Sequence, residues 1–137
     1  GNHDNYLVSI LKRYEIPLHQ VTLNYGKISF THGHLDVNIE EMNEIIIMGH
    51  EHPSIRLRDE AGVSHKFKCF LVGEMGGKTI IVLPSANEIA TGTDVNLTSR
   101  EDFLSPILRK VDIKEFRPYP ICIGESIEEF PKLKYLL

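Results

Sequence analysis

Three short segments of the sequence concentrate residues that can bind metal ions. They are residues 1–4 (GNHD), residues 32–34 (HGH) and residues 49–52 (GHEH). Neutral imidazole is a common ligand of divalent transition metals, and the side chain of Asn2 can add a neutral carbonyl oxygen. Each segment is expected in a loop, where a sheet presents functional groups. The pattern therefore predicts a divalent metal site.

The spacing within two of these segments supports the same interpretation. In an extended segment, residues i and i+2 point to the same side of the backbone. Each H-x-H pair is therefore expected to face one site, His32 together with His34 and His50 together with His52.

An isolated histidine is more often a surface or hydrogen-bonded residue than a ligand. His19 and His65 fit that ordinary role, because each is expected in an alternating strand without a partner motif. A single H-x-H pair would also be weak support for a metal site. Two such pairs after apolar segments, together with an Asn-His-Asp triplet, are much harder to assign to chance.

The ordered set GNHD, HGH and GHEH resembles the second half of the calcineurin-like metallophosphoesterase signature. That signature runs D-x-H, G-D, GNH followed by Asp or Glu, His, and GHxH. The similarity to the archaeal ICC-like branch extends through three further stretches, residues 49–59 (GHEHPSIRLRD), 83–87 (LPSAN) and 91–94 (TGTD). The GNHD and GHEH motifs are specific in combination, and the later stretches are weaker.

The resemblance implies an α/β fold, the calcineurin-like αββα sandwich of two packed sheets flanked by helices, here incomplete at its N-terminus. It also implies hydrolysis of phosphomonoesters or phosphodiesters by water activated between two divalent metals. Mn²⁺, Fe²⁺, Zn²⁺, Ni²⁺ and Co²⁺ all suit imidazole-rich sites. The implied substrates are phosphate esters, including nucleotides or nucleic acid.

The resemblance assigns a role to each motif residue. Asn2, His32 and His50 would bind the second metal, and His52 would bind the first. The remaining two are catalytic in this scheme. His3 would stabilise the phosphoryl transition state or protonate the leaving oxygen, a contribution of typically ~10²–10⁴-fold.

Asp4 would orient His3 through a ring N–H, although a simple helix N-cap is the alternative role for its carboxylate. The role of His34 stays open between a contact to substrate, a contact to a bound water, and no role in the site.

The departure from the signature is also informative. D-x-H and the first G-D should precede GNHD, and no Asp-x-His occurs among the 137 residues. In the family these motifs supply ligands of the first metal and the bridging aspartate. The chain alone is therefore expected to be a C-terminal part of the domain with low activity.

Two other functions remain compatible with the residues. Residues 32–36 spell H-x-H-x-D, as in metallo-β-lactamase-like hydrolases, but that motif requires a following histidine and position 37 is Val. A non-catalytic metal-binding or interaction domain derived from a phosphoesterase is the other alternative.

Composition limits the class of protein. A net charge of −4 argues against avid electrostatic binding of nucleic acid, although bound metals can supply positive charge. Cys69 and Cys122 form no CxxC motif and are expected as reduced, largely buried thiols, with one disulfide left open. We expect a single cytoplasmic domain over residues 1–137 with no membrane segment, and an oligomer is compatible with it.

The elements that would position the motifs follow from apolar periodicity and turn residues. A helix is expected from Asp4 or Asn5 to Tyr14, with Leu7, Ile10 and Leu11 packing on a sheet. Residues 45–48 are predicted as a central buried strand, because four apolar residues follow one another. The other predicted strands are 21–25, 28–31, 54–58, 63–73 and 78–84, with a helical turn at 38–43 and a loop at 85–100. The tail is predicted as strands at 103–111 and 119–124 and a helix at 127–137.

Overall fold

The fold is described by a computed structural model, which covers residues 1–122 and 126–136. In chain order its elements are α1 (Leu7–Arg13), β1 (Thr22–Tyr25), β2 (Ile28–Thr31), η1 (Ile39–Glu41), β3 (Ile45–Met48), β4 (Pro53–Arg58), β5 (Ser64–Met75), β6 (Lys78–Val82), β7 (Thr93–Asp94), η2 (Arg100–Asp102), η3 (Leu108–Lys110), η4 (Ile113–Glu115), β8 (Arg117–Cys122), β9 (Ser126–Ile127) and η5 (Leu133–Tyr135). The η elements are single 3₁₀ turns. The predicted α/β class is confirmed as a mixed sheet with one α-helix among the described residues.

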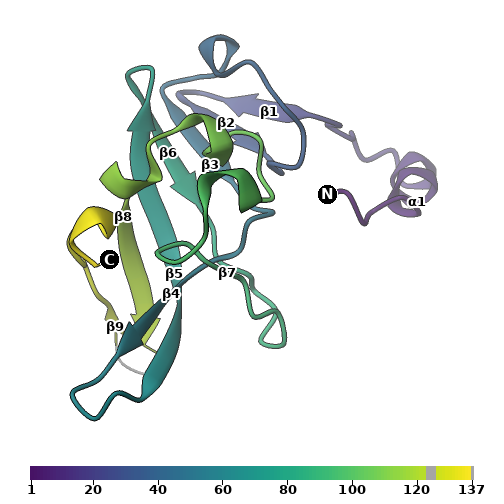
Figure 1. Cartoon of the computed structure of the whole chain (residues 1–137). Coiled ribbons are helices and arrows are strands. Elements are labelled where there is room, and N and C mark those ends of the chain that lie inside the picture. The colour runs from purple at the N-terminus through teal and green to yellow at the C-terminus, as the bar shows by residue number, and fades with distance from the viewer. Residues whose placement is uncertain (123–125, 137) are drawn as a thin grey trace.

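The strands form one hydrogen-bonded mixed sheet in the order β1-β2-β3-β6-β5-β4-β7 (Figure 1). Strand β3 lies between β2 and β6 and is parallel to both. Ile46 and Met48 of β3 are buried in the core, which confirms that this apolar segment is a central strand. The alternating apolar runs on either side of it also form the predicted strands.

Strand β5 is long enough to pair with different strands along its two halves. Its first half pairs with β4, and its second half lies between β6 and β8. The turn between β5 and β6 contains Gly76 and Gly77, both at positive φ (58° and 75°). This is the geometry of a two-residue hairpin turn that glycine favours, and the predicted hairpin is confirmed there.

Residues 103–111 do not form the predicted strand. They run through irregular backbone and the turn η3, and they cover the core next to the sheet (Figure 1). Four apolar side chains of this segment are buried, namely those of Phe103, Ile107, Leu108 and Val111. Their spacing suits a turning chain better than an alternating strand, and Pro106 lacks the N–H that a ladder would need.

Helix α1 does not pack on the sheet as predicted. It contains no buried residue, and Leu7 and Ile10 are 39% and 49% exposed. Figure 1 shows it standing apart from the strands. An open cleft of about 530 Å³ lies there, lined by side chains of α1 together with Leu23 and Phe30. The flanking helical layers of the expected sandwich are not observed in the described part of the chain.

The predicted terminal helix is also wrong. Residues 126–127 form the short strand β9, and the only helical turn after it in the described range is η5. Pro131 lacks a backbone N–H and disfavours a continuous helix at this point. The predicted strand at 119–124 corresponds to β8, which begins earlier, and residues 123 and 124 lie outside the described residues.

Both cysteines are free, with Cys69 buried and Cys122 half-buried. Among the described residues, no helix has the length and apolar character required to cross a membrane.

Candidate metal centre

The predicted site residues line one small cleft. Its volume is about 340 Å³, and its lining consists of Gly1, Asn2, His3, Asp4, His32, His50, His52 and Leu104. Four separate segments meet there: the chain before α1, the loop after β2, the loop after β3, and the segment after η2, which contributes Leu104. The expected convergence of Asn2, His32, His50 and His52, with His3 beside them, is observed.

Strand pairing explains why the two histidine loops meet. Strands β2 and β3 are parallel, and their last residues, Thr31 and Met48, are paired. The next residues continue this contact, since the Gly49 N–H donates to the His32 carbonyl over 3.2 Å. The loops after both strands therefore leave the sheet at the same edge.

The side chains of His32, His50 and Asn2 lie in mutual reach. The ring centroids of His32 and His50 are 5.1 Å apart, with the rings inclined by 61°. The Nε2 atom of His32 lies 3.0 Å from Oδ1 of Asn2. Gly1 packs so closely against the His32 ring that an added Cβ would lie 2.7 Å from Cε1. Two imidazoles and one amide oxygen thus face a common space.

The backbone of these loops differs from the extended form that the sequence suggested. Gly33 has φ of 97°, and His50 and His52 have φ of 64° and 50°. The left-handed region is unfavourable for residues with a Cβ, and such conformations concentrate at functional sites. The predicted extended backbone is therefore wrong for these loops, although both histidines of GHEH, His50 and His52, line the cleft.

Burial keeps the two imidazoles neutral. Desolvation, together with the positive charges of the Gly1 ammonium and the neighbouring imidazoles, lowers the pKa of His32 to about 4. Desolvation also lowers the pKa of His50, against an opposing effect of the Glu51 carboxylate. Both rings are then uncharged at neutral pH, which is the state that binds a metal.

The GNHD segment supports only part of its predicted chemistry. The carboxylate of Asp4 accepts a hydrogen bond from the Gly1 ammonium, which lowers the Asp4 pKa. No hydrogen bond joins Asp4 to His3 within the described residues, and His3 Nε2 instead lies 3.4 Å from Asn2 Nδ2. Asp4 is not the helix N-cap either, since α1 is preceded by Tyr6 without a side-chain cap.

His34 belongs to the same group of rings. Its centroid lies 5.1 Å from that of His32 and 5.9 Å from that of His50. Its Nδ1 atom is buried without a hydrogen-bond partner, and the residue lines the larger open cleft rather than the small one. The His34 ring therefore carries a buried nitrogen without a hydrogen-bond partner beside the candidate site.

The backbone of His52 contacts the TGTD stretch at residues 91–94. The Thr93 N–H donates to the His52 carbonyl over 3.0 Å. Gly92 approaches the same carbonyl so closely that a Cβ would lie 2.1 Å from the oxygen, and its φ is 70°. Only glycine fits both constraints.

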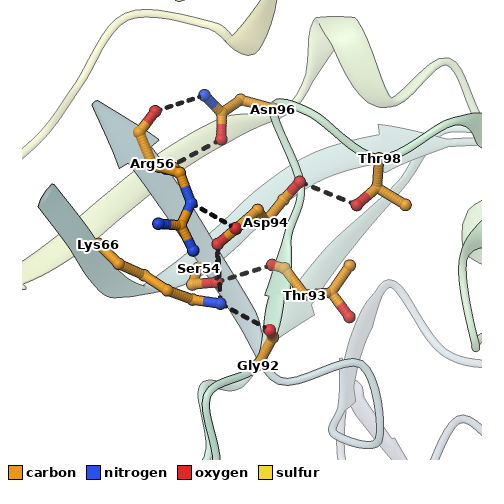
Figure 2. Close-up of polar contacts among 8 residues, drawn as sticks. All are labelled: Ser54, Arg56, Lys66, Gly92, Thr93, Asp94, Asn96 and Thr98. Carbon is orange, nitrogen blue, oxygen red and sulfur yellow. Dashed lines mark hydrogen bonds and ion pairs between the residues drawn. The ribbon is translucent and has the colours of Figure 1, made fainter. Parts of the chain in front are cut away.

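Asp94 anchors this stretch to the sheet (Figure 2). Its carboxylate accepts from Ser54 Oγ at 3.0 Å and from Arg56 Nε at 2.8 Å, and it lies 2.9 Å from Lys66 Nζ. Burial raises the Asp94 pKa, but the hydrogen bonds from Lys66, Arg56 and Ser54 outweigh it and lower the pKa overall. Lys66 also donates to the Gly92 carbonyl over 2.9 Å.

Asn96 completes the same cluster (Figure 2). Its side chain accepts from the Arg56 N–H and donates to the Arg56 carbonyl, over 3.0 and 2.9 Å. The GHEHPSIR and TGTD stretches, which lie far apart in the sequence, are thus joined by polar contacts next to His52.

Sequence reasoning missed three residues near the cleft. Leu104 lines it, while Glu51 and Ser105 are buried beneath it. Glu51 was visible as the variable position of GHxH, but a glutamate between two loop histidines is normally expected in solvent. Leu104 and Ser105 carried no signal, since they lie more than 50 residues further along the chain in a segment predicted as a strand.

The donor set suits one weakly held metal ion. Among residues 1–122 and 126–136, no three His, Cys, Asp or Glu side chains are arranged to bind one ion. The arrangement offers two neutral imidazoles and the Asn2 oxygen at one position, with His52 near it. These ligand types fit a divalent transition metal and do not fit calcium, which takes oxygen ligands.

Comparison with known proteins identified no relative of this chain. No family model matches the chain, and neither a curated protein nor a solved structure is detectably similar to it.

Proposed function

We propose that this chain is the C-terminal, metal-binding part of a calcineurin-like phosphoesterase, and that its sheet is part of the αββα sandwich of that fold. The observation that carries the proposal is the meeting of Asn2, His32 and His50 from three motifs in one cleft. The motif order GNHD, HGH and GHEH supports the same assignment.

The chain's own residues have distinct tasks in this proposal. Asn2, His32 and His50 would hold one divalent metal, and His52 would supply a ligand to a second. Two bound metals would supply Lewis-acid chemistry, lowering the pKa of a bound water and neutralising charge on the phosphoryl oxygens. His3 lies in the cleft, where its ring can donate a hydrogen bond or a proton to an oxygen of the substrate.

The chain by itself should bind at most one metal well. The position of the second would keep only His52 from these residues. Without a bridging carboxylate, nothing anionic offsets the repulsion between two dications held a few ångströms apart. Of the residues that the structure describes, Asp4 is the one acidic residue lining the cleft, and its carboxylate is paired with the Gly1 ammonium.

The open cleft beside α1 supports the proposal that further strands complete the domain. Apolar side chains of α1 and of the β1–β3 face are exposed there, including Leu7, Leu23 and Phe30. A segment carrying D-x-H and G-D on strand ends would cover this surface and bring the missing carboxylate to the cleft. Left uncovered, the same surface favours association between copies of the chain.

A second candidate function is metal binding without catalysis. The observation favouring it is that, among the described residues lining the cleft, only Asp4 is acidic, and its carboxylate is paired with the Gly1 ammonium rather than free to bridge two metals. The two functions differ in phosphodiesterase activity and in the number of metals bound by the completed domain.

The test is hydrolysis of bis(p-nitrophenyl) phosphate in excess Mn²⁺, measured with the chain alone and with a separately made segment carrying D-x-H and G-D. The proposal expects little hydrolysis by the chain alone and a large gain on adding the segment. The gain should vanish for His50→Ala and persist for His65→Ala, a histidine bonded to Asp59 on an exposed part of β5. Full activity of the chain alone, or no gain with a segment shown to bind, would contradict the proposal.

A further inference from the structure

Glu51 is buried in the middle of the GHEH loop. It is 1% exposed, and it is the only acidic or basic side chain buried to this extent in the described ranges 1–122 and 126–136. Burying a carboxylate is costly unless it is hydrogen-bonded. The Glu51 carboxylate meets this need by accepting from the N–H groups of Leu104 and Ser105, over 3.3 and 2.8 Å.

Ser105 extends the connection to the other histidine loop. Its buried hydroxyl donates to the carbonyl of Gly33 over 2.9 Å. Gly33 separates His32 from His34 and itself packs on Met48, since an added Cβ would lie 2.7 Å from the methionine methyl carbon. Residues 104–105 thus bind the GHEH loop on one side and the HGH loop on the other.

The backbone around Glu51 needs such an anchor. His50 and His52, on either side of it, both occupy the left-handed region. The Glu51 N–H donates to the Gly49 carbonyl over 2.8 Å, which tightens the turn further. Unfavourable conformations of this kind persist only where the surroundings over-determine them. The inward anchor of Glu51 turns the two flanking imidazoles out to the cleft.

We propose that Glu51 and Ser105 are positioning residues, which fix the His50 loop relative to the His32 loop and so preorganise the imidazole pair for a divalent metal. The proposal rests on the proposed function for the identity of the bound group. The fixed relation between the two rings does not depend on it and can be measured without metal.

The decisive experiment compares Ser105→Ala with Ser29→Ala in the 137-residue chain. Ser29 is an equally buried serine in β2 that accepts from the Asn43 N–H and donates to Asn24, without bridging the two histidine loops. Two quantities are measured for each variant: the imidazole NMR shifts of His32 and His50 without metal, and the affinity for Co²⁺ with its visible absorption spectrum.

For Ser105→Ala we expect shifted His32 and His50 resonances, a changed Co²⁺ spectrum and an affinity lowered by about 10- to 100-fold, the usual cost of removing a group that orients a ligand. Ser29→Ala should lower the melting temperature but leave both imidazoles and the Co²⁺ affinity close to wild type. Glu51→Gln should resemble Ser105→Ala, because an amide NH₂ would face one of the two N–H donors.

Equal effects of Ser105→Ala and Ser29→Ala on imidazole shifts would overturn the proposal, because the serine would then be merely structural. If the wild-type chain binds no Co²⁺, the proposed function fails while the metal-free shifts still decide the positioning role. If Glu51→Gln does not fold, Ser105→Ala supplies the answer on its own.

Discussion

The imidazole of His50 lies 5.1 Å from that of His32, and the backbone rather than a side-chain bond brings the two rings together. Thr31 of β2 and Met48 of β3 are paired in a parallel register, so the following residues leave the sheet side by side. Asn2 approaches from a third segment and closes the group. The central sheet thus brings the His32 and His50 loops to one edge, and the contacts of Ser105 with Glu51 and Gly33 are proposed to fix the two loops relative to each other.

Gly92→Ala should destabilise the chain strongly. An added Cβ would lie 2.1 Å from the His52 carbonyl oxygen, in addition to the cost of a positive φ. We expect a loss of about 2–5 kcal/mol, the sum of about 1–2 kcal/mol for left-handed backbone and about 1–3 kcal/mol for overpacking. Urea unfolding measures it.

Gly62→Ala is the matched control for that variant. Gly62 has a φ of 80°, but nothing lies within 4 Å of its built Cβ. It should lose only the backbone cost of about 1–2 kcal/mol. Equal losses in the two variants would show that Gly92 does not press against His52.

The two thiols should differ in reactivity. Cys69 is fully buried, and burial raises its pKa to about 12, whereas Cys122 is half-buried. Since the thiolate is the reactive form, Ellman's reagent should label only Cys122 in the folded chain and both thiols in denaturant. Cys122→Ser should abolish the native-state reaction. Rapid labelling of Cys69 in the folded variant would contradict the placement of β5 in the core.

The metal-free chain should lose stability on mild acidification through His32. Burial lowers its folded-state pKa to about 4 from an ordinary value of 6.5. As the pH falls through that window the unfolded state binds the proton first, so unfolding becomes more favourable. The contribution is fully present above about pH 6.5 and is lost progressively down to about pH 4.

The measurement is the unfolding free energy from pH 7 to pH 4 in the presence of EDTA, for wild type and His32→Gln. Because carboxylates titrate in both chains, the difference between the two curves reports His32. The wild-type curve should fall more steeply. Parallel curves would show that the His32 ring is solvated rather than desolvated.

The sequence predicted the central part of the fold because the signals there were local. Ile46 and Met48 lie in an unbroken apolar run, and Gly76 with Gly77 marks a hairpin. The run 103–111 was misjudged because a short apolar segment has the same composition in a strand and in a turning core segment. Helix α1 has the expected apolar face, but periodicity cannot say whether a partner surface is present for it to cover.

The sequence likewise predicted only part of the candidate site. Motif order identified the cleft-lining histidines and Asn2. It could not reveal Glu51 beneath the loop, because only tertiary structure brings Ser105 to its carboxylate. The sequence also could not predict the left-handed backbone at His50 and His52, because a histidine does not indicate a positive φ.

The most direct test of the central claim is the equilibrium binding of Co²⁺ to the 137-residue chain by titration calorimetry at pH 7.5. The account predicts one site per chain, lost in both His32→Ala and His50→Ala and weakened in Asn2→Ala. Removal of a ligand should cost more than the about 10- to 100-fold caused by removing a group that only orients one. His65→Ala should bind like wild type. Absence of binding by the wild-type chain, or binding that survives His32→Ala and His50→Ala unchanged, would contradict a metal centre in this cleft.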